Sequence, residues 1–354
     1  MAQTGTQSVS DRRIEKIVPL VTPALLRHEL PLGVEAAGTV VEGRTAIAQV
    51  LDRVDDRLLV VVGPCSVHDP VAAREYADLL AGAVQRFADD LLIVMRVYFE
   101  KPRSTVGWKG LINDPGLDGS GDVNRGLRTA RSLLLEVLAR RLPVGCEFLD
   151  PIMPQYLADT VGWGAIGART VESQVHRQLA SGLSMPVGMK NRPDGSVGTA
   201  VDAIRAAGVP HIFTGIDESG TPAILHTRGN ADCHLILRGG AAGPNYHAEA
   251  VNDALRRLRG AGLPERLVID ASHGNSGKDH ERQPLVAADI ANQLEAGQRG
   301  IVGVMLESFL VPGRQELDPT GPLVHGQSVT DACMGWEVTE RVLERLALAT
   351  RHRR

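Results

Sequence analysis

Short apolar runs recur along the whole chain and alternate with longer stretches of helical periodicity. Ten such runs are present, at 58–64, 91–97, 144–149, 163–167, 186–190, 210–216, 223–227, 233–238, 266–271 and 301–306. Most are continuously apolar, which is typical of strands covered on both faces of a parallel sheet. Helical patterns fill most of the gaps, over 70–87, 122–141, 171–182, 197–207, 247–260 and 281–296. Strand–helix alternation on this scale predicts an α/β fold.

Ten runs are two more than an eight-stranded barrel needs. The runs 210–216 and 223–227 are separated by a short turn-like stretch and not by a crossover helix. We therefore interpret about 210–227 as an inserted two-stranded antiparallel hairpin. Eight strands remain, and they predict a (β/α)8 TIM barrel. A doubly wound open sheet is the alternative, but no GxGxxG motif follows the first strand.

The chain is expected to have two parts. Residues 51–354 form the barrel with its hairpin, and residues 1–50 form an N-terminal extension that packs on the barrel or on a neighbouring subunit. The extension contains two helical pieces, DRRIEKIVP and RTAIAQVLDRV.

The N-terminus has no apolar core of signal-peptide length, and no stretch approaches the roughly 20 apolar residues of a membrane span. Four widely spaced cysteines without a CxxC motif indicate reduced thiols. With a net charge of −4, these features predict a cytoplasmic protein that binds neither membranes nor nucleic acid.

Polar or ionisable residues stand at the ends of the predicted barrel strands, where barrel enzymes carry their chemistry. Six of them are cations, mainly from strands two to six: Arg96, Lys101, Arg103, Arg169, Lys190 and Arg238. Like charges in one pocket are unfavourable unless an anion binds there, and these groups suit phosphate and carboxylate oxygens. The pattern predicts a pocket for one or two phosphorylated small substrates. The alternative is that each cation pairs with a neighbouring carboxylate.

A second group consists of Cys65 after strand one, His273 after strand seven, Glu307 at strand eight and Asp331 at the expected start of the last helix. Strand eight of a closed barrel lies between strands seven and one, so these side chains can converge. Their mixed chemistry suits Mn, Fe, Co or Zn better than Mg or Ca. Cys65 could also be a buried core thiol or a nucleophile paired with His273. The carboxylates favour the metal over the nucleophile, because negative neighbours oppose thiolate formation.

Long motifs run through the chain in order: GPCSVHDP, MRVYFEKPRSTVGWKGLINDP, GCEFLD, GAIGARTVESQVHRQLASGLSMPVGMKN, HLILRGG, DASHGNSGK, GVMLES and SVTDACMGWE. From about residue 10 onward the chain resembles the type I 3-deoxy-D-arabino-heptulosonate 7-phosphate (DAHP) synthases of bacteria and fungi. The resemblance implies condensation of phosphoenolpyruvate with erythrose 4-phosphate and water, giving DAHP and phosphate. This reaction is the first step of the shikimate pathway to the aromatic amino acids.

The resemblance also implies roles for individual positions. One divalent metal ion would be held by Cys65, His273, Glu307 and Asp331. Phosphoenolpyruvate would lie among Arg96, Lys101, Glu147, Gly167, Ala168, Arg169, Lys190 and Arg238, and erythrose 4-phosphate at Lys101, Pro102, Arg103 and Ser104. Lys101 is the expected proton donor to the aldehyde oxygen, and Glu147 is expected to handle the water. Ser104 stands where the family often has threonine and keeps the hydroxyl.

Feedback inhibition by an aromatic amino acid in a homodimer or homotetramer is implied as well. The inhibitor pocket would involve the hairpin and a neighbour's N-terminal segment, at Asp11, Pro154, Gln155, Leu179, Leu183, Ser184, Phe213 and Gly215. Glycine at 215 favours tyrosine, since phenylalanine-sensitive members tend to have serine there. Insensitivity and inhibition by tryptophan remain alternatives.

Three other functions compete with this interpretation. A synthase that makes an eight-carbon sugar acid from arabinose 5-phosphate would resemble KANRS where this chain has KPRST. A paralogue in secondary metabolism would use a related aldose or aminoaldose phosphate. A phosphometabolite-binding sensor that kept the fold is disfavoured by the intact set of four ligands and six cations.

Overall fold

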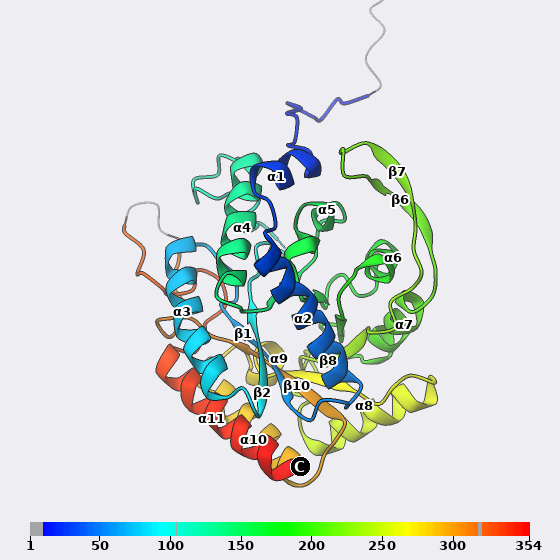
Figure 1. The fold of residues 1–354 in the computed structure, drawn as a ribbon, viewed down its shortest axis with the longest axis vertical. Helices are drawn as coiled ribbons and strands as arrows, with labels where there is room; N and C mark the ends of the chain where they lie inside the picture. Colours follow the sequence, from blue (N-terminus) through cyan, green and yellow to red (C-terminus); the bar gives the residue numbers. More distant parts are fainter. Residues whose placement is uncertain (1–9, 104, 318–320) are drawn as a thin grey trace, which may run out of the picture.

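Eight parallel strands close into a barrel in the order β1-β10-β9-β8-β5-β4-β3-β2 in the computed structural model, which describes residues 10–103, 105–317 and 321–354 (Figure 1). The strands are β1 (Leu58–Gly63), β2 (Leu91–Arg96), β3 (Val144–Glu147), β4 (Trp163–Ile166), β5 (Val187–Lys190), β8 (His234–Leu237), β9 (Leu267–Asp270) and β10 (Ile301–Glu307). Every strand residue except Glu147 is buried, which explains the continuous apolar runs. The predicted barrel is confirmed, and β10 lies between β9 and β1 as expected.

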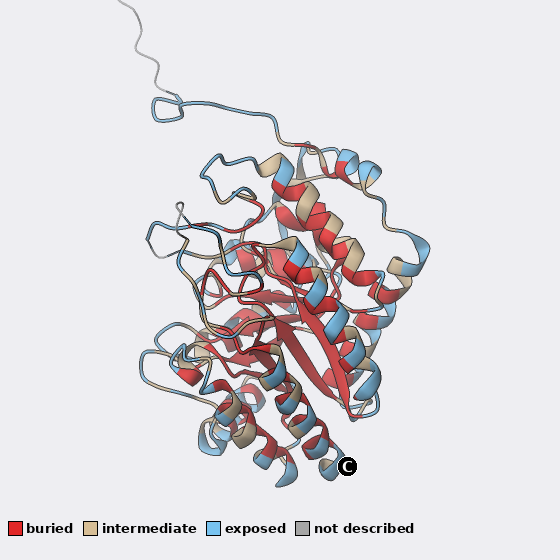
Figure 2. Ribbon diagram, turned by 90° about the vertical axis from the view of Figure 1, so that its left-hand side faces the viewer, coloured by how far each residue is buried: buried red, intermediate tan, exposed pale blue. Residues whose placement is uncertain are grey.

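Helices follow the barrel strands and cover the outside, with their exposed faces turned to solvent (Figure 2). They are α3 (Pro70–Arg86), α4 (Val123–Leu138), α5 (Met153–Leu157) with the 3₁₀ helix η1 (Ala158–Thr160), α6 (Gln174–Gly182), α7 (Gly198–Ala207), α8 (Ala248–Gly260), α9 (His273–Ser276) with α10 (Gln283–Glu295), and α11 (Trp336–Arg353). No helix among the described residues is long and apolar enough to cross a membrane.

The predicted hairpin is confirmed as β6 (Ile212–Ile216) and β7 (Pro222–His226), which pair antiparallel outside the barrel (Figure 1). Its turn is closed by Asp217, whose Oδ1 accepts hydrogen bonds from the backbone N–H groups of Ser219 and Thr221, both 2.9 Å. The backbone N–H of Ala24 donates to the carbonyl of Glu218 in the same turn (2.7 Å). The segment around Ala24 therefore contacts the turn of the hairpin.

The N-terminal extension contains α1 (Pro23–Glu29) and α2 (Val34–Leu51). The helix predicted at DRRIEKIVP is wrong, since residues 14–22 are not helical. Its apolar residues Ile14, Ile17 and Val18 are more than half exposed, so no buried face is available to stabilise a helix there.

Residues 44–51 of the second predicted helical piece belong to α2, and its last three residues lie beyond the end of that helix. Ile47, Val50 and Leu51 of α2 join an inner hydrophobic cluster with barrel residues such as Leu59 and Trp163. The C-terminal half of α2 is thus packed against the core of the barrel.

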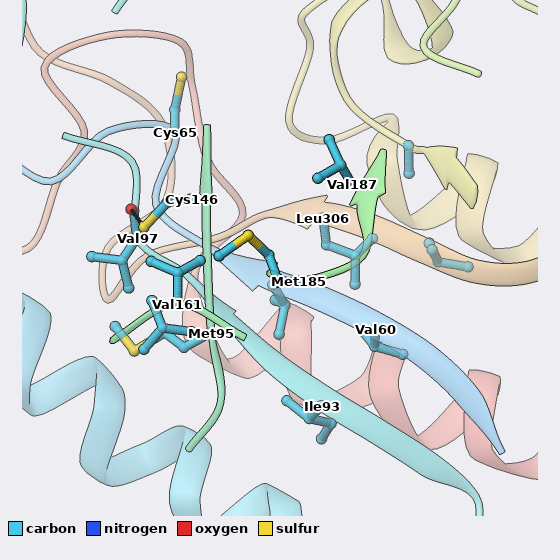
Figure 3. Packing of buried hydrophobic residues seen from close by; sticks show 14 of the residues in the cluster. Val60, Cys65, Ile93, Met95, Val97, Cys146, Val161, Met185, Val187 and Leu306 are labelled. Carbon is cyan, nitrogen blue, oxygen red and sulfur yellow. Dashed lines mark hydrogen bonds between the residues drawn. The ribbon is translucent and has the colours of Figure 1, made fainter. Parts of the chain in front are cut away.

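The buried cysteines differ in their surroundings. Cys146 lies among the packed side chains of the core, and its thiol donates to the carbonyl of Val97 (3.1 Å; Figure 3). Cys233 is 3% exposed and also belongs to the core. The sulfur of Cys65 points away from the core side chains labelled in Figure 3, just beyond the end of β1.

Candidate active site

A cavity opens at the C-terminal ends of the barrel strands. It is lined by Arg96, Lys101, Pro102, Arg103, Glu147, Gly167, Ala168, Arg169, Lys190, Arg238, His273, Lys278, Thr330 and Asp331. All the described residues predicted to contact the substrates therefore meet in one place. Ser104 lies outside the described residues.

Arg96 is fixed at the floor of this cavity. Its Nε donates to the carbonyl of Pro64 (3.2 Å), and its Nη2 donates to the carbonyl of Cys65 (3.1 Å) and to Oε1 of Glu307 (2.8 Å). Its guanidinium carbon lies 3.7 Å from the centre of the Tyr98 ring, within the range of a cation–π contact. These contacts hold a buried guanidinium in one orientation and join the cationic pocket to Glu307.

Lys190 is fixed by Asp270, a residue that the sequence interpretation missed. The distance from Lys190 Nζ to Asp270 Oδ2 is 3.0 Å, and His273 Nδ1 lies 2.9 Å from the same oxygen. Burial alone would raise the pKa of Asp270, but the charges of His273 and Lys190 hold it well below its usual value. One ionised carboxylate thus orients both a cation and an imidazole. The signal in the sequence was an aspartate that ends an apolar strand.

The alternative of simple ion pairing holds for part of the cationic set. Arg96 pairs with Glu307 and Lys190 with Asp270, whereas Arg103 donates to the carbonyl of Trp108 (2.8 Å). Seven cations and two carboxylates line the cavity, so its charge is positive even with those pairs. An anionic ligand remains the group that this lining suits.

A metal-type cluster adjoins the cavity. One ligand atom each from Cys65, Glu307 and Asp331 lie within 4.8 Å of one another. His273 stands beside this group, with Nε2 3.8 Å from Oε1 of Glu307. Thiol, imidazole and carboxylate together fit a divalent ion of the Mn, Fe, Co or Zn type, as predicted.

Asp331 does not start the last helix, which corrects the prediction. α11 begins at Trp336 with Gly335 as its N-cap. Two single-residue bridges, Ser308 to Met334 and Gly313 to Cys333, keep this stretch extended and delay the helix. Asp331 therefore reaches the cluster from a loop.

Lys101 connects the cluster to the cavity. Its Nζ lies 3.0 Å from Sγ of Cys65. Burial and the charge of Glu307 raise the pKa of the Cys65 thiol, and Lys101 opposes them. A raised thiol pKa argues against an activated nucleophile and leaves a metal ligand, which a cation would deprotonate, as the better interpretation.

Glu147 points a carboxylate toward the cavity. Its Oε1 is buried and has no hydrogen-bond partner among the described residues. A Cβ atom added at Gly167 would lie 2.2 Å from that oxygen, so glycine at this position leaves the room that the carboxylate occupies. A buried acceptor without a partner in a polar cavity is suited to hold a water or a substrate hydroxyl.

A second cavity lies between the hairpin and the α5 and α6 region. Six of the eight positions predicted for the inhibitor line it: Pro154, Gln155, Leu179, Leu183, Ser184 and Phe213. Asp11 and Gly215 do not line it. A Cβ atom at Gly215 would lie 2.7 Å from Cδ1 of Leu225, which does line the cavity.

Sequence reasoning also missed Lys278 and Thr330, which line the first cavity. A signal for Lys278 was present, because the chain has 33 arginines and only five lysines, Lys16, Lys101, Lys109, Lys190 and Lys278. Three of these five line this cavity.

A closed (β/α)8 barrel with a cationic cavity and a thiol–carboxylate cluster at its strand ends defines a class: barrel enzymes that act on phosphorylated small molecules with a divalent metal. A family model described as "DAHP synthetase I family" matches residues 35–344. The chain belongs to this family.

Named relatives cover nearly the whole chain. The Phe-sensitive phospho-2-dehydro-3-deoxyheptonate aldolase of Escherichia coli is 55% identical over 97% of this chain and 98% of its own. A Trp-sensitive enzyme of Enterobacter agglomerans is 53% identical over 96% and 98%, and a tyrosine-inhibited enzyme of Schizosaccharomyces pombe 49% identical over 98% and 95%. The solved phospho-2-dehydro-3-deoxyheptonate aldolase of Francisella tularensis superposes with a TM-score of 0.95 at 51% identity, covering 96% of this chain and 99% of that one.

Proposed function

We propose that the cavity at the strand ends condenses phosphoenolpyruvate with erythrose 4-phosphate and water, giving DAHP and phosphate. One observation carries the proposal: every described residue of the expected substrate set lines a single cavity that adjoins the metal-type cluster. The family and the named relatives agree with this activity and do not favour a paralogue with an aminoaldose phosphate. The enzyme is a 3-deoxy-7-phosphoheptulonate synthase.

Binding and orientation are the first task of the chain's own residues. Arg96, Arg169, Lys190 and Arg238 present guanidinium and ammonium donors to the carboxylate and phosphate of phosphoenolpyruvate. Arg103 lines the same cavity and would hold the phosphate of the aldose. Two anions fixed in this way have their reacting carbons aligned, which lowers the entropic part of the barrier.

Proton transfer is the second task. Lys101 would give a proton to the aldehyde oxygen. Burial alone would lower the pKa of Lys101, but the charges of Cys65 and Glu307 outweigh it and raise that pKa, so the side chain carries the proton it would donate. Glu147, with its free buried oxygen, would orient the water that adds at carbon two. Phosphate then leaves from the hemiketal phosphate. Cys65, His273, Glu307 and Asp331 would hold the divalent ion, which supplies Lewis-acid polarisation of the aldehyde oxygen.

The test is product formation. Periodate–thiobarbiturate detection with phosphoenolpyruvate and erythrose 4-phosphate, arabinose 5-phosphate or an aminoaldose phosphate should give product with erythrose 4-phosphate and added Mn²⁺. A chelator should abolish it. Lys101→Met should lower kcat by at least about 100-fold, while the exposed Lys109→Met variant keeps it. Absence of product from erythrose 4-phosphate would contradict the proposed activity. Full turnover by Lys101→Met would contradict only the proposed role of Lys101.

We also propose that an aromatic amino acid binds the second cavity and inhibits the enzyme. The six predicted positions around that cavity support this, and relatives named for sensitivity to phenylalanine, tyrosine or tryptophan match nearly the whole chain in sequence. Identities of 49–55% to all three kinds of relative do not indicate which amino acid inhibits this enzyme. The proposal of tyrosine as the inhibitor therefore rests on Gly215.

The two-part organisation and the assembly belong to the same proposal. Residues 1–50 would serve oligomerisation and regulation in a homodimer or homotetramer, with residues 51–354 as the catalytic barrel. The exposed apolar side chains of Ile14, Ile17 and Val18 support a contact with a neighbouring subunit. A cytoplasmic location agrees with four free, buried cysteines.

A further inference from the structure

Lys278 lines the substrate cavity, but none of the expected substrate contacts uses it. Its Nζ lies 3.3 Å from Oδ1 of Asp331, and its side chain is 57% exposed at this position. Asp331 is one of the three residues whose ligand atoms cluster within 4.8 Å. Lys278 therefore contacts the cluster through the carboxylate of Asp331.

The backbone places Lys278 there at a steric cost. α9 is a single turn that begins at His273, and the two residues after it, Gly277 and Lys278, have φ angles of 65° and 64°. The backbone N–H of Lys278 donates to the carbonyl of His273 (2.7 Å). A left-handed conformation is unfavourable for a residue with a Cβ atom, and such residues concentrate at functional sites. Glycine would fit here without strain, yet the chain has lysine.

The composition of the chain points the same way. Arginine outnumbers lysine 33 to five, so the chain supplies most of its positive charge as guanidinium. Lysine occurs at position 278 all the same, as it does at Lys101 and Lys190 in this cavity. An ammonium group is a compact point charge, which suits contact with one carboxylate oxygen.

We propose that Lys278 is a positioning residue of the metal cluster, which holds the Asp331 carboxylate in place for a divalent ion. The proposal rests on the metal site named above. Carboxylates that bind metals are themselves held by hydrogen bonds from an outer layer of residues, and the loss of such a partner weakens metal binding. Asp331 needs such a partner because it comes from a loop and not from a barrel strand.

Electrostatics alone makes the opposite prediction. A positive charge near the cluster repels a divalent cation, so its removal should tighten metal binding if Lys278 acted only through its field. Loss of orientation should weaken binding instead. The sign of the change therefore separates a positioning role from a general charge effect.

The experiment measures Mn²⁺ and Co²⁺ affinity by competition with a chelator, without any substrate. Lys278→Met should weaken both affinities about tenfold and alter the visible spectrum of the Co²⁺-loaded protein. Lys278→Arg, which keeps the charge, should recover most of the affinity. Lys16→Met, the same change on the exposed N-terminal segment, should bind metal like the unchanged protein.

Lys278→Gly separates this role from a structural one. Glycine accepts a φ of 64° without strain, so this variant should keep the Tm of the unchanged protein while it loses metal affinity as Lys278→Met does. Equal or tighter metal binding by Lys278→Met would overturn the proposal. Failure of the unchanged protein to bind either ion would instead contradict the metal site itself.

Discussion

Cys65 and Cys146 are both fully enclosed thiols, and what surrounds each sulfur decides its role. Cys146 donates to a core carbonyl, whereas Cys65 lies 3.0 Å from Lys101 and within the cluster formed with Glu307 and Asp331. Exposure does not distinguish a core thiol from a metal ligand, because both are buried. The residues around each sulfur distinguish the two roles, and a single sequence does not show which residues these are.

Alanine substitutions at the two cysteines should have opposite effects. Cys65→Ala should lose metal and activity but keep the fold, because it removes a ligand and only a single sulfur atom from the interior. Cys146→Ala should keep the metal and lose about 1 kcal/mol of unfolding free energy, because it leaves a small cavity in the core. Metal content by elemental analysis and urea denaturation of both variants check this. Full metal content in Cys65→Ala would return Cys65 to the core.

Gly167 matters because of the space it leaves. In Gly167→Ala the new methyl group would meet Oε1 of Glu147 at 2.2 Å and turn the carboxylate away from its place at the cavity. A catalytic group displaced by about 1 Å loses on the order of 100-fold in rate, so kcat should fall by about that factor with Tm nearly unchanged. Steady-state kinetics and a melting curve suffice. Unchanged kcat would remove Glu147 from the mechanism.

At the scale of whole elements, much of the fold was predictable from sequence. Continuous apolar runs such as 58–64 and 301–306 marked the barrel strands, because strands covered on both faces have no polar alternation. The short link DESGTP revealed the hairpin, because a crossover helix needs more residues. The strand order then followed from closure of the barrel, and with it the meeting of Cys65, Glu307 and His273.

Elements without a buried face were harder to predict. The stretch DRRIEKIVP has helical spacing, but its apolar residues are exposed and the stretch is not helical, so the periodicity gave a wrong prediction. Asp331 was placed on a helix that begins five residues later at Trp336. Lys278 stands in a left-handed turn whose position depends on α9, a single turn too short to be recognised from periodicity. In each case tertiary contacts decide the local structure.

The hairpin should determine which amino acid inhibits the enzyme. Gly215→Ser should weaken tyrosine inhibition about tenfold, because the added side chain would press on Leu225, whose side chain lines the second cavity; a tenfold loss corresponds to about 1.4 kcal/mol of binding. Inhibition curves with all three aromatic amino acids give the readout. The matched Thr214→Ser variant on the same strand should behave like the unchanged protein. Inhibition by phenylalanine alone in the unchanged protein would contradict the tyrosine assignment.

Across the whole molecule, stability and chemistry lie at opposite ends of the barrel. The strand C-termini carry charged side chains around the cavity, while the opposite end is filled by Trp163, His234 and the apolar residues of α2. The charged end is tolerated because the interior of the other end is well packed. His234, at the packed end, is nevertheless titratable.

His234 should make the whole barrel sensitive to acid. It is 1% exposed, its Nε2 accepts from Trp163 Nε1 (3.2 Å) and its Nδ1 donates to the carbonyl of Asp232 (3.0 Å), so the folded chain holds it neutral. Burial lowers its pKa to about 3, against about 6.5 in the unfolded chain. The unfolded chain therefore binds the extra proton first as pH falls below about 6.5, and the folded state loses stability until about pH 3.

The expected loss is about 1.4 kcal/mol per pH unit, or about 2 kcal/mol between pH 6.5 and pH 5. His234→Gln can keep both hydrogen bonds, with its amide oxygen toward Trp163 and its amide nitrogen toward Asp232, but it does not titrate. Its urea midpoint should therefore fall less steeply with acid than that of the unchanged protein, while the two differ little in slope above pH 7. Comparing the two proteins cancels the other groups that titrate in this range. Identical acid dependence would mean that His234 is protonated in the folded barrel, which the two hydrogen bonds of the neutral ring oppose.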